Sequence, residues 1–404
     1  MLASGFGGIG MTAITCIEDL RRLYRRRVPR MFYDYAETGS YGMQTFRDNV
    51  DDFAAIRLRQ RVGLDLSRRD VGGRMLGTPA AMPLALAPVG LTGMQCADGE
   101  IKAARAAEAF GVPFTLSTHA ICSIEDIAAH TQKPFWFQLY VMRDEDFTRR
   151  LLARAHAAKC SALMLTVDCQ VLGQRHVDIK NGLSAPPRLT LQNLINMSMK
   201  PRWWWGMLRT RRHGFGNFFG HVKGVNDMEA LNRWAGEQFE PRLDWSRIKK
   251  LRKQWGGKFI IKGIMEPEDA RRALACGADA IVVSNHGGRQ LDGAISSIRV
   301  LPAIAETVGG KAEIWMDGGI RSGQDIYKAL ALGADGVLIG RSFIYGLGAM
   351  GEKGVRQALE ILQAELDVTM ALTGCPRISD ISRKDVILRE DVNGRFCLQR
   401  KDFR

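Results

Sequence analysis

The residues best suited to catalysis stand directly after short apolar segments that are rich in β-branched residues. His286 follows residues 280–283, inside the segment from Ser284 to Arg289, and Asp168 follows residues 162–167. A histidine that is oriented by a carboxylate can accept a proton as a general base. A single histidine in such a place is more often structural, so this interpretation depends on the polar residues that accompany it.

Other apolar segments of the same kind are also followed by polar residues or glycines. These are Ser117 and His119, Gln138 and Tyr140, Thr166 and Asp168 with Arg175 in the next loop, Lys262, Asp317 to Arg321, and Gly340 with Arg341. Two arginines near a base can hold a substrate carboxylate through paired hydrogen bonds. The glycines at 318, 319 and 340 precede helical patterns, where backbone N–H groups and a nearby arginine can bind a phosphate. Glycine in a tight turn is the alternative interpretation.

Alternation of apolar segments with helical patterns determines where these polar residues would meet. The eight predicted strands are residues 84–87, 114–116, 135–139, 162–167, 259–261, 280–283, 314–316 and 336–339. Alanine-rich amphipathic patterns predict helices at 99–110, 144–158, 267–275 and 323–332. This pattern indicates a (β/α)8 TIM barrel, an α/β fold whose catalytic groups lie at the C-terminal ends of the strands. A doubly wound sheet is the alternative, but it would need a G-x-G-x-x-G turn after the first strand, and the sequence has none there.

Two segments interrupt the alternation. Residues 17–75 form a predicted N-terminal helical extension, and residues 176–257 form a long insert between the fourth and fifth strands. From Ile179 to Asn226 the insert has no acidic residue but eight Lys and Arg, together with three consecutive tryptophans at 203–205. Basic residues mixed with tryptophan are typical of a membrane interface, and also of single-stranded nucleic-acid binding. A lid over the active site, or a packing insert, is the third interpretation.

Composition excludes several other classes of protein. The 404 residues are 46% hydrophobic and 25% charged, which supports a large core and argues against disorder. The eight cysteines form no C-x-x-C pair and the seven histidines no H-E-x-x-H motif, so we expect reduced thiols and no metal site. Residues 75–97 are uncharged but contain three prolines, which fits a buried strand with its loops better than a membrane span. The net charge of +14 favours an anionic partner or surface.

Several longer motifs, spread over residues 14–385, are specific. They are Tyr33-Asp34-Tyr35, Ala87-Pro88-Val89-Gly90, Phe137-Gln138-Leu139-Tyr140, Thr166-Val167-Asp168, Ile261-Lys262-Gly263, Ser284 to Gln290, Asp317-Gly318-Gly319 and Gly340-Arg341. With these motifs the chain resembles the FMN-dependent 2-hydroxy-acid oxidising family, which includes glycolate oxidase, flavocytochrome-type lactate dehydrogenase and mandelate dehydrogenase. Within that family it is most similar to the bacterial respiratory L-lactate dehydrogenases.

The resemblance implies a role for each matching residue. His286 would take a proton from the substrate, and Asp168 would stabilise the resulting imidazolium. The substrate carboxylate and hydroxyl would be bound by Arg175, Arg289, Tyr35 and Tyr140. Lys262 would lie beside N1 and O2 of the flavin and stabilise its anionic reduced form. The other FMN contacts would be Ala87, Pro88, Val89, Ser117, Gln138, Thr166, Ser284, Asp317, Gly318, Gly319, Arg321, Gly340 and Arg341.

The resemblance also implies a reaction. L-Lactate, or a similar small L-2-hydroxy acid, would be oxidised to the 2-keto acid, and the electrons would pass from FMN to a quinone or a cytochrome. Gly90 stands where the oxygen-using oxidases of the family tend to carry alanine, which favours a dehydrogenase. His119 stands on the substrate side, where glycolate oxidase-like members have tryptophan, and leaves the exact substrate open. An oxidase that makes hydrogen peroxide and a mandelate-type dehydrogenase are the alternatives.

The resemblance finally implies a location and a domain plan. The insert occupies the position of the membrane-binding segment of the membrane-bound members, so we expect residues 199–220 to contact the cytoplasmic side of the inner membrane peripherally, and we expect no nucleic-acid partner. A homotetramer is common in the family. One barrel domain would cover residues 14–385, between a disordered extension at 1–13 and a tail at 386–404. Met11 is a candidate for the true start.

Overall fold

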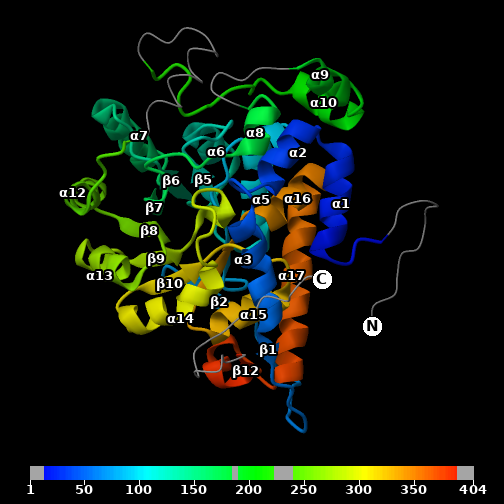
Figure 1. The fold of residues 1–404 in the computed structure, drawn as a ribbon, viewed down its shortest axis with the longest axis vertical. Helices are drawn as coiled ribbons and strands as arrows, with labels where there is room; N and C mark the ends of the chain where they lie inside the picture. The colour runs from blue at the N-terminus through cyan, green and yellow to red at the C-terminus, as the bar shows by residue number, and fades with distance from the viewer. Residues whose placement is uncertain (1–12, 184–189, 223–239, 389–404) are drawn as a thin grey trace.

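An eight-stranded parallel barrel forms the centre of the protein. The computed structural model describes residues 13–183, 190–222 and 240–388. The strands of the sheet are ordered β4-β11-β10-β9-β8-β7-β6-β5. The two outer strands meet where the backbone N–H of Leu86 donates to the carbonyl of Pro113 at 2.9 Å and Leu86 pairs with Phe114. Helices surround the sheet (Figure 1), so the predicted (β/α)8 barrel is confirmed.

The barrel strands coincide closely with the predicted ones. They are β4 (Leu84–Leu86), β5 (Thr115–Ser117), β6 (Trp136–Leu139), β7 (Ala162–Thr166), β8 (Lys258–Ile264), β9 (Ala280–Val283), β10 (Glu313–Met316) and β11 (Gly336–Ile339). The largest difference is at β8, which extends beyond the predicted 259–261 at both ends. Its extension carries Lys262 and the following glycine into the ladder with β9, where the register shifts.

The helices that follow the strands form the outer layer of the barrel. They are α5 (Gly99–Phe110), α6 (Ile124–His130), α7 (Glu145–Ala157), α12 (Trp245–Trp255), α13 (Pro267–Ala275), α14 (Ser297–Val308), α15 (Gly323–Ala331), α16 (Arg341–Met350) and the long α17 (Glu352–Thr373). Capping explains several of their ends. Ser322 and Asp325 form a capping box at the start of α15, and Gly111 ends α5 with a φ of +89°.

Strand residues alternate between two cores. Ala162, Met164, Ile260 and Val282 point into the barrel, where Trp136 and Trp315 stack with ring centroids 5.0 Å apart. Their neighbours in the strands belong to a second core, which the surrounding helices cover. This twofold alternation fills the barrel with side chains, so a ligand can bind only at its ends.

The N-terminal extension covers one side and both ends of the barrel. It contains α1 (Ile17–Arg27), α2 (Arg30–Glu37), α3 (Gln44–Ala55), β1 (Arg57–Leu58) and the hairpin of β2 (Gly73–Met75) with β3 (Thr78–Ala80). Strand β1 pairs with β12 (Val386–Ile387), so the ordered fold continues past the boundary predicted at residue 385. Short 3-10 turns at Ile378–Asp380 and Arg383–Asp385 precede β12.

The long insert lies at the same end of the molecule as α2 (Figure 1). It contains α8 (His176–Lys180), α9 (Leu191–Ser198) and α10 (Pro201–Arg209), and Trp203 of α10 stacks on Phe32 of α2 with centroids 5.6 Å apart. Trp203 also donates to the carbonyl of Met94, which lies in the short α4 (Thr92–Gln95). The last part of the predicted insert is α12, which packs beside α7 as a regular barrel helix, with Trp255 stacked on His156.

Two expectations concern residues outside the described ranges. The disordered extension at 1–13 lies almost wholly there, as does the tail beyond residue 388. Among the described residues, no helix has the length and the apolar composition needed to cross a membrane.

Candidate active site

A cavity of about 410 Å³ opens at the C-terminal ends of the barrel strands. Most of the predicted site residues line it: Tyr35, Ala87, Pro88, Val89, Gly90, Ser117, His119, Tyr140, Arg175, Lys262, His286, Arg289, Asp317, Gly318, Gly319, Arg321, Gly340 and Arg341. Gln138, Thr166 and Ser284 lie buried behind its wall, and Asp168 lies behind His286. The fold therefore brings together residues that are up to about 300 positions apart in the sequence.

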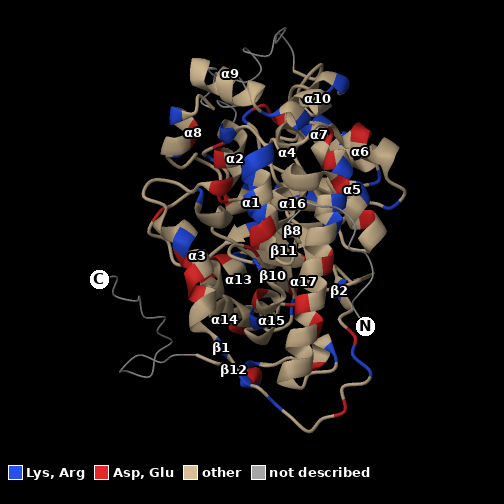
Figure 2. Ribbon diagram, turned by 90° about the vertical axis from the view of Figure 1, so that its right-hand side faces the viewer, with Lys and Arg blue, Asp and Glu red and all other residues tan. Residues whose placement is uncertain are grey.

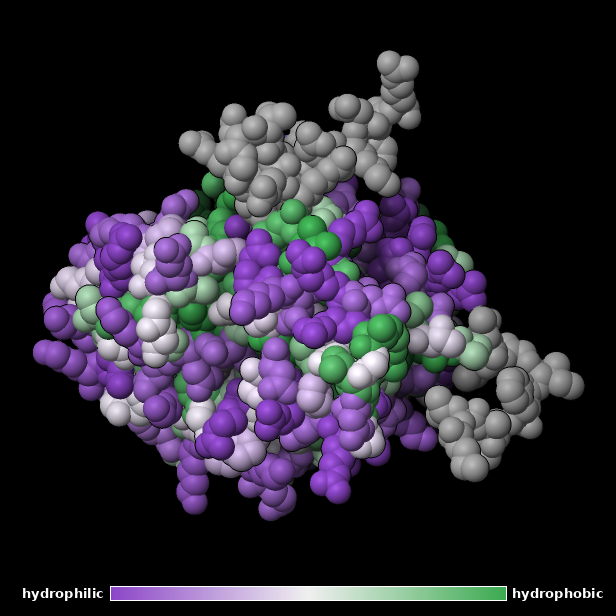
Figure 3. Space-filling model, turned by 90° about the horizontal axis from the view of Figure 1, so that it is seen from below, coloured by the Kyte–Doolittle hydropathy of each residue, from purple (hydrophilic) through white to green (hydrophobic). Residues whose placement is uncertain are grey.

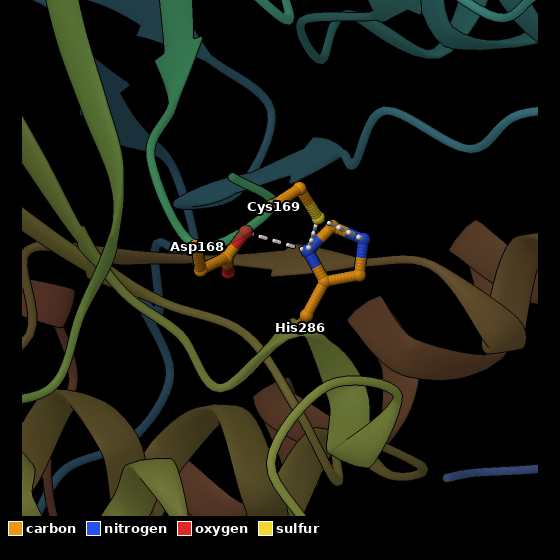
Figure 4. A group of neighbouring side chains, drawn as sticks. All are labelled: Asp168, Cys169 and His286. Atoms are coloured by element: carbon orange, nitrogen blue, oxygen red, sulfur yellow. Dashed lines mark hydrogen bonds and ion pairs between the residues drawn. The ribbon is translucent and has the colours of Figure 1, made fainter. Parts of the chain in front are cut away.

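His286 and Asp168 form the central pair of this site. Nδ1 of His286 lies 2.8 Å from Oδ1 of Asp168 (Figure 4). The His286 backbone has a φ of +59°, a left-handed conformation that is uncommon outside glycine. Its N–H donates to Oγ of Ser284 at 3.1 Å, which helps to hold that turn. The strained turn thus directs the imidazole towards the carboxylate that follows β7.

The protonation of this pair suits a general base. Burial lowers the pKa of His286, and this effect outweighs the opposing influence of Asp168. Burial raises the pKa of Asp168, but its interactions with His286 and Lys262, which include the hydrogen bond to the ring, outweigh burial and leave the carboxyl pKa below its usual value. The carboxylate is therefore ionised and accepts the Nδ1 proton, so Nε2 of the neutral ring carries the free lone pair. The hydroxyl of Tyr140 lies 3.5 Å from Nε2.

Lys262 places a buried ammonium group beside this pair. Its Nζ donates to Oγ of Ser284 at 2.7 Å and forms an ion pair with Oδ2 of Asp317 at 2.9 Å. Burial lowers the pKa of Lys262, but the charges of Asp317 and Asp168 outweigh it and raise the pKa overall. The lysine therefore stays charged inside the cavity wall, where it can stabilise negative charge that develops nearby.

Two arginines line the substrate end of the cavity, but their contacts differ. Arg289 is held by the backbone carbonyls of Tyr35 and Thr38 and by Asp178, whose Oδ2 lies 3.2 Å from Nη2. Its guanidinium also lies over the Tyr35 ring, 4.6 Å from the centroid. Arg175 donates to the carbonyl of Arg289 and to Gln290, both at 3.2 Å, and its Nη1 has no hydrogen-bond partner in the described part of the chain. Arg175 is therefore the arginine that can turn a donor towards a substrate carboxylate.

Asp178 is a candidate site residue that the sequence did not predict. It lies on α8, three residues after Arg175, and its side chain is only 9% exposed beside Arg289. A signal was present, because a spacing of three places Arg175 and Asp178 on one face of a helical turn. Helix α8 lies outside the alternation of predicted strands and helices. The alternation therefore could not predict that Asp178 pairs with Arg289.

His119 and Gly90 form the wall opposite His286. The His119 ring lies 5.2 Å from Tyr140, 5.6 Å from Phe215 and 5.2 Å from Phe218 between ring centroids. Burial, with a smaller effect of Arg175, lowers the pKa of His119 to about 4, so its ring is neutral at pH 7. A Cβ at Gly90 would lie 3.3 Å from the Tyr35 hydroxyl and 3.4 Å from His119, so even alanine would be tight there.

The glycines after β10 and β11 form the other end of the cavity. Gly318 and Gly319 have φ values of +93° and +91°, and a Cβ at Gly319 would lie 1.9 Å from the carbonyl oxygen of Asn49. These glycines are thus required by close packing as well as by the turn. Helix α16 begins at Arg341, and the free N–H groups of its first turn can bind an anion.

The two arginines at this end are not equivalent. Arg341 donates to the carbonyls of Ala36, Gly287 and Thr38, and burial lowers its pKa to about 10. The side chain of Arg321 makes a single hydrogen bond within the described ranges, from Nη1 to the carbonyl of Ile320 at 2.9 Å. Arg321 therefore has more donors left for a phosphate, whereas Arg341 mainly connects α2 to the turn after β9.

The residues present fit the FMN group that the sequence predicts. Nε2 of Gln138 and Oγ1 of Thr166 are buried polar atoms without a hydrogen-bond partner in the described ranges. Such atoms are costly unless a ligand pairs with them, and the polar edge of a flavin ring offers both donors and acceptors. With the Lys262 ammonium group beside them and the helix start of α16 beyond, these residues suit the ring and the phosphate respectively.

Comparisons with known proteins show the family of the chain. The family described as FMN-dependent dehydrogenase matches residues 24–388. The L-lactate dehydrogenase of Caulobacter vibrioides (strain NA1000 / CB15N) is 46% identical over 380 residues, which are 94% of this chain and 98% of that protein. The L-lactate dehydrogenase of Pseudomonas aeruginosa (strain LESB58) is 46% identical over 381 residues, which are 93% and 99% of the two chains.

Solved structures of two other enzymes share the fold of this chain. The crystal structure of the monotopic membrane protein (S)-mandelate dehydrogenase superposes with a TM-score of 0.88 and 36% identity, covering 93% of this chain and 100% of that one. A mandelate oxidase superposes with a TM-score of 0.79 and 35% identity, covering 93% and 98% of the two chains.

Proposed function

Because the chain belongs to the FMN-dependent dehydrogenase family, and is thus an FMN-dependent 2-hydroxy-acid oxidoreductase, we propose that its substrate is L-lactate or a similar small L-2-hydroxy acid. The observation that carries the proposal is the His286–Asp168 pair in the wall of a cavity that also presents Arg175 and Lys262. A base, a carboxylate-binding arginine and a buried ammonium group are the three functions that oxidation of a 2-hydroxy acid needs.

The side chains divide the work as follows. The chemistry that FMN would supply when bound in this cavity is acceptance of the two electrons that leave the substrate carbon. Nε2 of His286 takes a proton from the substrate, and Asp168 stabilises the imidazolium through its bond to Nδ1. Arg175 and Arg289 position the carboxylate, and the hydroxyls of Tyr35 and Tyr140 bind the carboxylate or the hydroxyl of the substrate. Lys262 would supply positive charge to stabilise the negative charge that reduction of the cofactor creates.

Further residues of the cavity would hold the cofactor. Arg321 and the start of α16 would bind the phosphate, and the buried amide of Gln138 and hydroxyl of Thr166 would pair with the ring. Ser117 and Ser284 would make further polar contacts there. Ala87 to Val89 would support the face of the ring, and Asp317, Gly318, Gly319, Gly340 and Arg341 would complete the site.

A small substrate fits the wall opposite the base. His119 occupies that wall with Tyr140 and Phe215, while Phe218 packs behind the His119 ring, which is neutral. These four rings favour the methyl group of lactate over a larger side chain. The two L-lactate dehydrogenases described above, at 46% identity, support the same choice.

We further propose that the electrons pass to a quinone or a cytochrome at the cytoplasmic face of the inner membrane, and that the enzyme is a homotetramer. Exposed large hydrophobic side chains of α9, α10 and the turn between them support the membrane contact: Leu191, Leu194, Ile195, Met199, Trp204, Trp205 and Leu208. The exposed arginines 202, 209 and 211 flank them, and the arginines of α1 lie below α9 and α10 (Figure 2). Hydrophobic residues beside arginine suit an anionic membrane surface.

The opposite end of the molecule has a different surface. There hydrophilic residues predominate and hydrophobic ones form separate patches (Figure 3). This difference favours membrane contact at the end formed by α9 and α10, which contains residues 199–220.

An oxidase that produces hydrogen peroxide is the second candidate, because a mandelate oxidase shares the fold at 35% identity. Gly90 favours the dehydrogenase. Oxygen uptake at the rate of dye reduction would establish the oxidase instead.

The test of the proposed function is anaerobic bleaching of the flavin by a panel of 2-hydroxy acids: glycolate, L-lactate, D-lactate, L-mandelate and longer homologues. We expect L-lactate to bleach FMN fastest. His286→Ala should leave yellow, FMN-bound protein that lactate does not bleach. Normal bleaching of this variant would overturn the assignment of the base, and preferred bleaching by mandelate would overturn the assignment of the substrate.

A further inference from the structure

Three different metal-binding side chains meet at the catalytic base. Asp168, Cys169 and His286 offer a carboxylate oxygen, a sulfur and a ring nitrogen that all lie within 4.8 Å of one another (Figure 4). They form the only such group in the described part of the chain. Asp168 and Cys169 follow β7, and His286 follows β9, so the barrel holds the donors in place from two strands.

The distances between the donors approach those of a tetrahedral zinc site. Sγ of Cys169 lies 3.4 Å from Nδ1 of His286, and Nδ1 lies 2.8 Å from Oδ1 of Asp168. Zinc bonds of ordinary length at tetrahedral angles separate sulfur from nitrogen by about 3.5 Å and nitrogen from oxygen by about 3.3 Å. Sγ also lies 3.8 Å from Nε2, so the sulfur sits over the face of the ring, and the Cys169 side chain must turn towards the Nδ1 lone pair while the carboxylate withdraws by about 0.5 Å.

Two further features point to a ligand here. Oδ2 of Asp168 is a buried oxygen without a hydrogen-bond partner in the described ranges. Cys169 and His286 line the cavity, so a fourth coordination position would face it and could take water or an oxygen of the substrate. Three protein ligands with one open position are the pattern of an accessible zinc site rather than a structural one. The charges of Lys262 and Arg175 act on the same residues and weaken the binding of a cation.

We propose that Asp168, Cys169 and His286 form an inhibitory site for a thiophilic divalent cation, with Zn²⁺ as the probe. Zinc would replace the hydrogen bond between His286 and Asp168, and the thiol proton of Cys169 would leave to solvent. With zinc on Nδ1, the neutral imidazole carries its proton on Nε2, and Nε2 then has no lone pair for the substrate proton. The metal would stop proton abstraction without removing the base. The inhibition rests on the proposed role of His286, whereas zinc binding does not.

The experiment measures zinc binding and zinc inhibition in the FMN-loaded enzyme. Zinc is titrated into wild-type protein, Cys169→Ala and Cys169→Ser by calorimetry, and lactate-dependent dye reduction is followed in the same series, each variant against its own rate without zinc. Cys96→Ala is the matched control, because Cys96 is a partly exposed thiol outside the cavity lining. Flavin absorbance reports whether each variant is folded and loaded.

We expect zinc to inhibit the wild-type enzyme, a chelator to restore the rate, and Cys169→Ala to raise the half-inhibitory concentration at least tenfold. Cys96→Ala should behave as wild type. Equal sensitivity of Cys169→Ala and wild type would overturn the proposal, as would the lack of zinc binding by the wild-type enzyme. If lactate fails to bleach the flavin without zinc, the proposed function fails, yet loss of zinc binding in Cys169→Ala would still establish the site.

Discussion

Nδ1 of His286 donates its proton to Oδ1 of Asp168 across 2.8 Å, and this contact decides which ring nitrogen faces the substrate. Asp168 keeps its charge because His286 and Lys262 lower its pKa more than burial raises it. The carboxylate therefore fixes the tautomer of the ring and later stabilises its charged form. Both effects require the negative charge as well as the shape of the side chain.

The first prediction concerns the pH dependence of this pair. Because burial lowers the pKa of His286, the base is neutral and active at pH 7, so kcat/KM for lactate should be flat there and fall only at acid pH, below the ordinary histidine value. Asp168→Asn removes an influence that raises the pKa of His286, so the acid limb should move to lower pH. The plateau should drop by roughly 10²- to 10⁴-fold.

A pH series of kcat/KM with an artificial dye checks both effects. Flavin absorbance should be unchanged, because Asp168 does not line the cavity. An acid limb that moves to higher pH in the variant would contradict the assignment of Asp168 as the partner of the base.

The second prediction concerns the buried pair of Lys262 and Asp317. Lys262→Met leaves Asp317 buried without its positive partner, 2.9 Å from where the ammonium group was. The free energy of unfolding should fall by about 3–5 kcal/mol, and lactate should no longer reduce the flavin at a measurable rate. Denaturant unfolding and anaerobic flavin spectra provide the two measurements.

A double variant separates the two roles of the lysine. Lys262→Met with Asp317→Asn removes both charges, so most of the stability should return. Flavin reduction should not return, because the positive charge is still missing. Recovery of activity in the double variant would show that Lys262 matters only through its ion pair.

The third prediction concerns Asp178, which holds Arg289 from α8. Asp178→Asn keeps the shape of the side chain but removes the charge that accepts from Nη2 at 3.2 Å. We expect the KM for lactate to rise about tenfold, which corresponds to the loss of a charged hydrogen bond, while kcat changes less. Steady-state kinetics measure the change, and Asp244→Asn, which alters only the cap of α12, is the control. An unchanged KM would mean that the backbone carbonyls of Tyr35 and Thr38 suffice to position Arg289.

The sequence predicts the barrel well because the information is local. Each strand is an apolar segment, each helix has its own pattern and cap, and the closed topology then places His286 opposite Asp168 although 118 residues separate them. Contacts made by the loops and by the N-terminal extension carry no such pattern. The guanidinium of Arg341 donates its hydrogen bonds to the carbonyls of Ala36, Gly287 and Thr38. These bonds depend on where α2 packs, and the spacing of residues in the sequence does not predict that position.

The fourth prediction concerns the hydrophobic end formed by α9 and α10. Trp205 and Leu208 of α10 are 63% and 65% exposed, and Trp204 is partly exposed beside them. Replacing all three by serine should move the protein from the membrane fraction to the soluble fraction. Its rate with a water-soluble dye should be unchanged, because none of the three lines the cavity.

The matched control is Val368→Ser with Leu372→Ser, two exposed hydrophobic residues of α17. Binding to vesicles that contain anionic lipid, measured by sedimentation, should fall for the first variant and persist for the control. Equal loss in both variants would mean that exposed hydrophobic area in general, rather than this end of the molecule, drives the association.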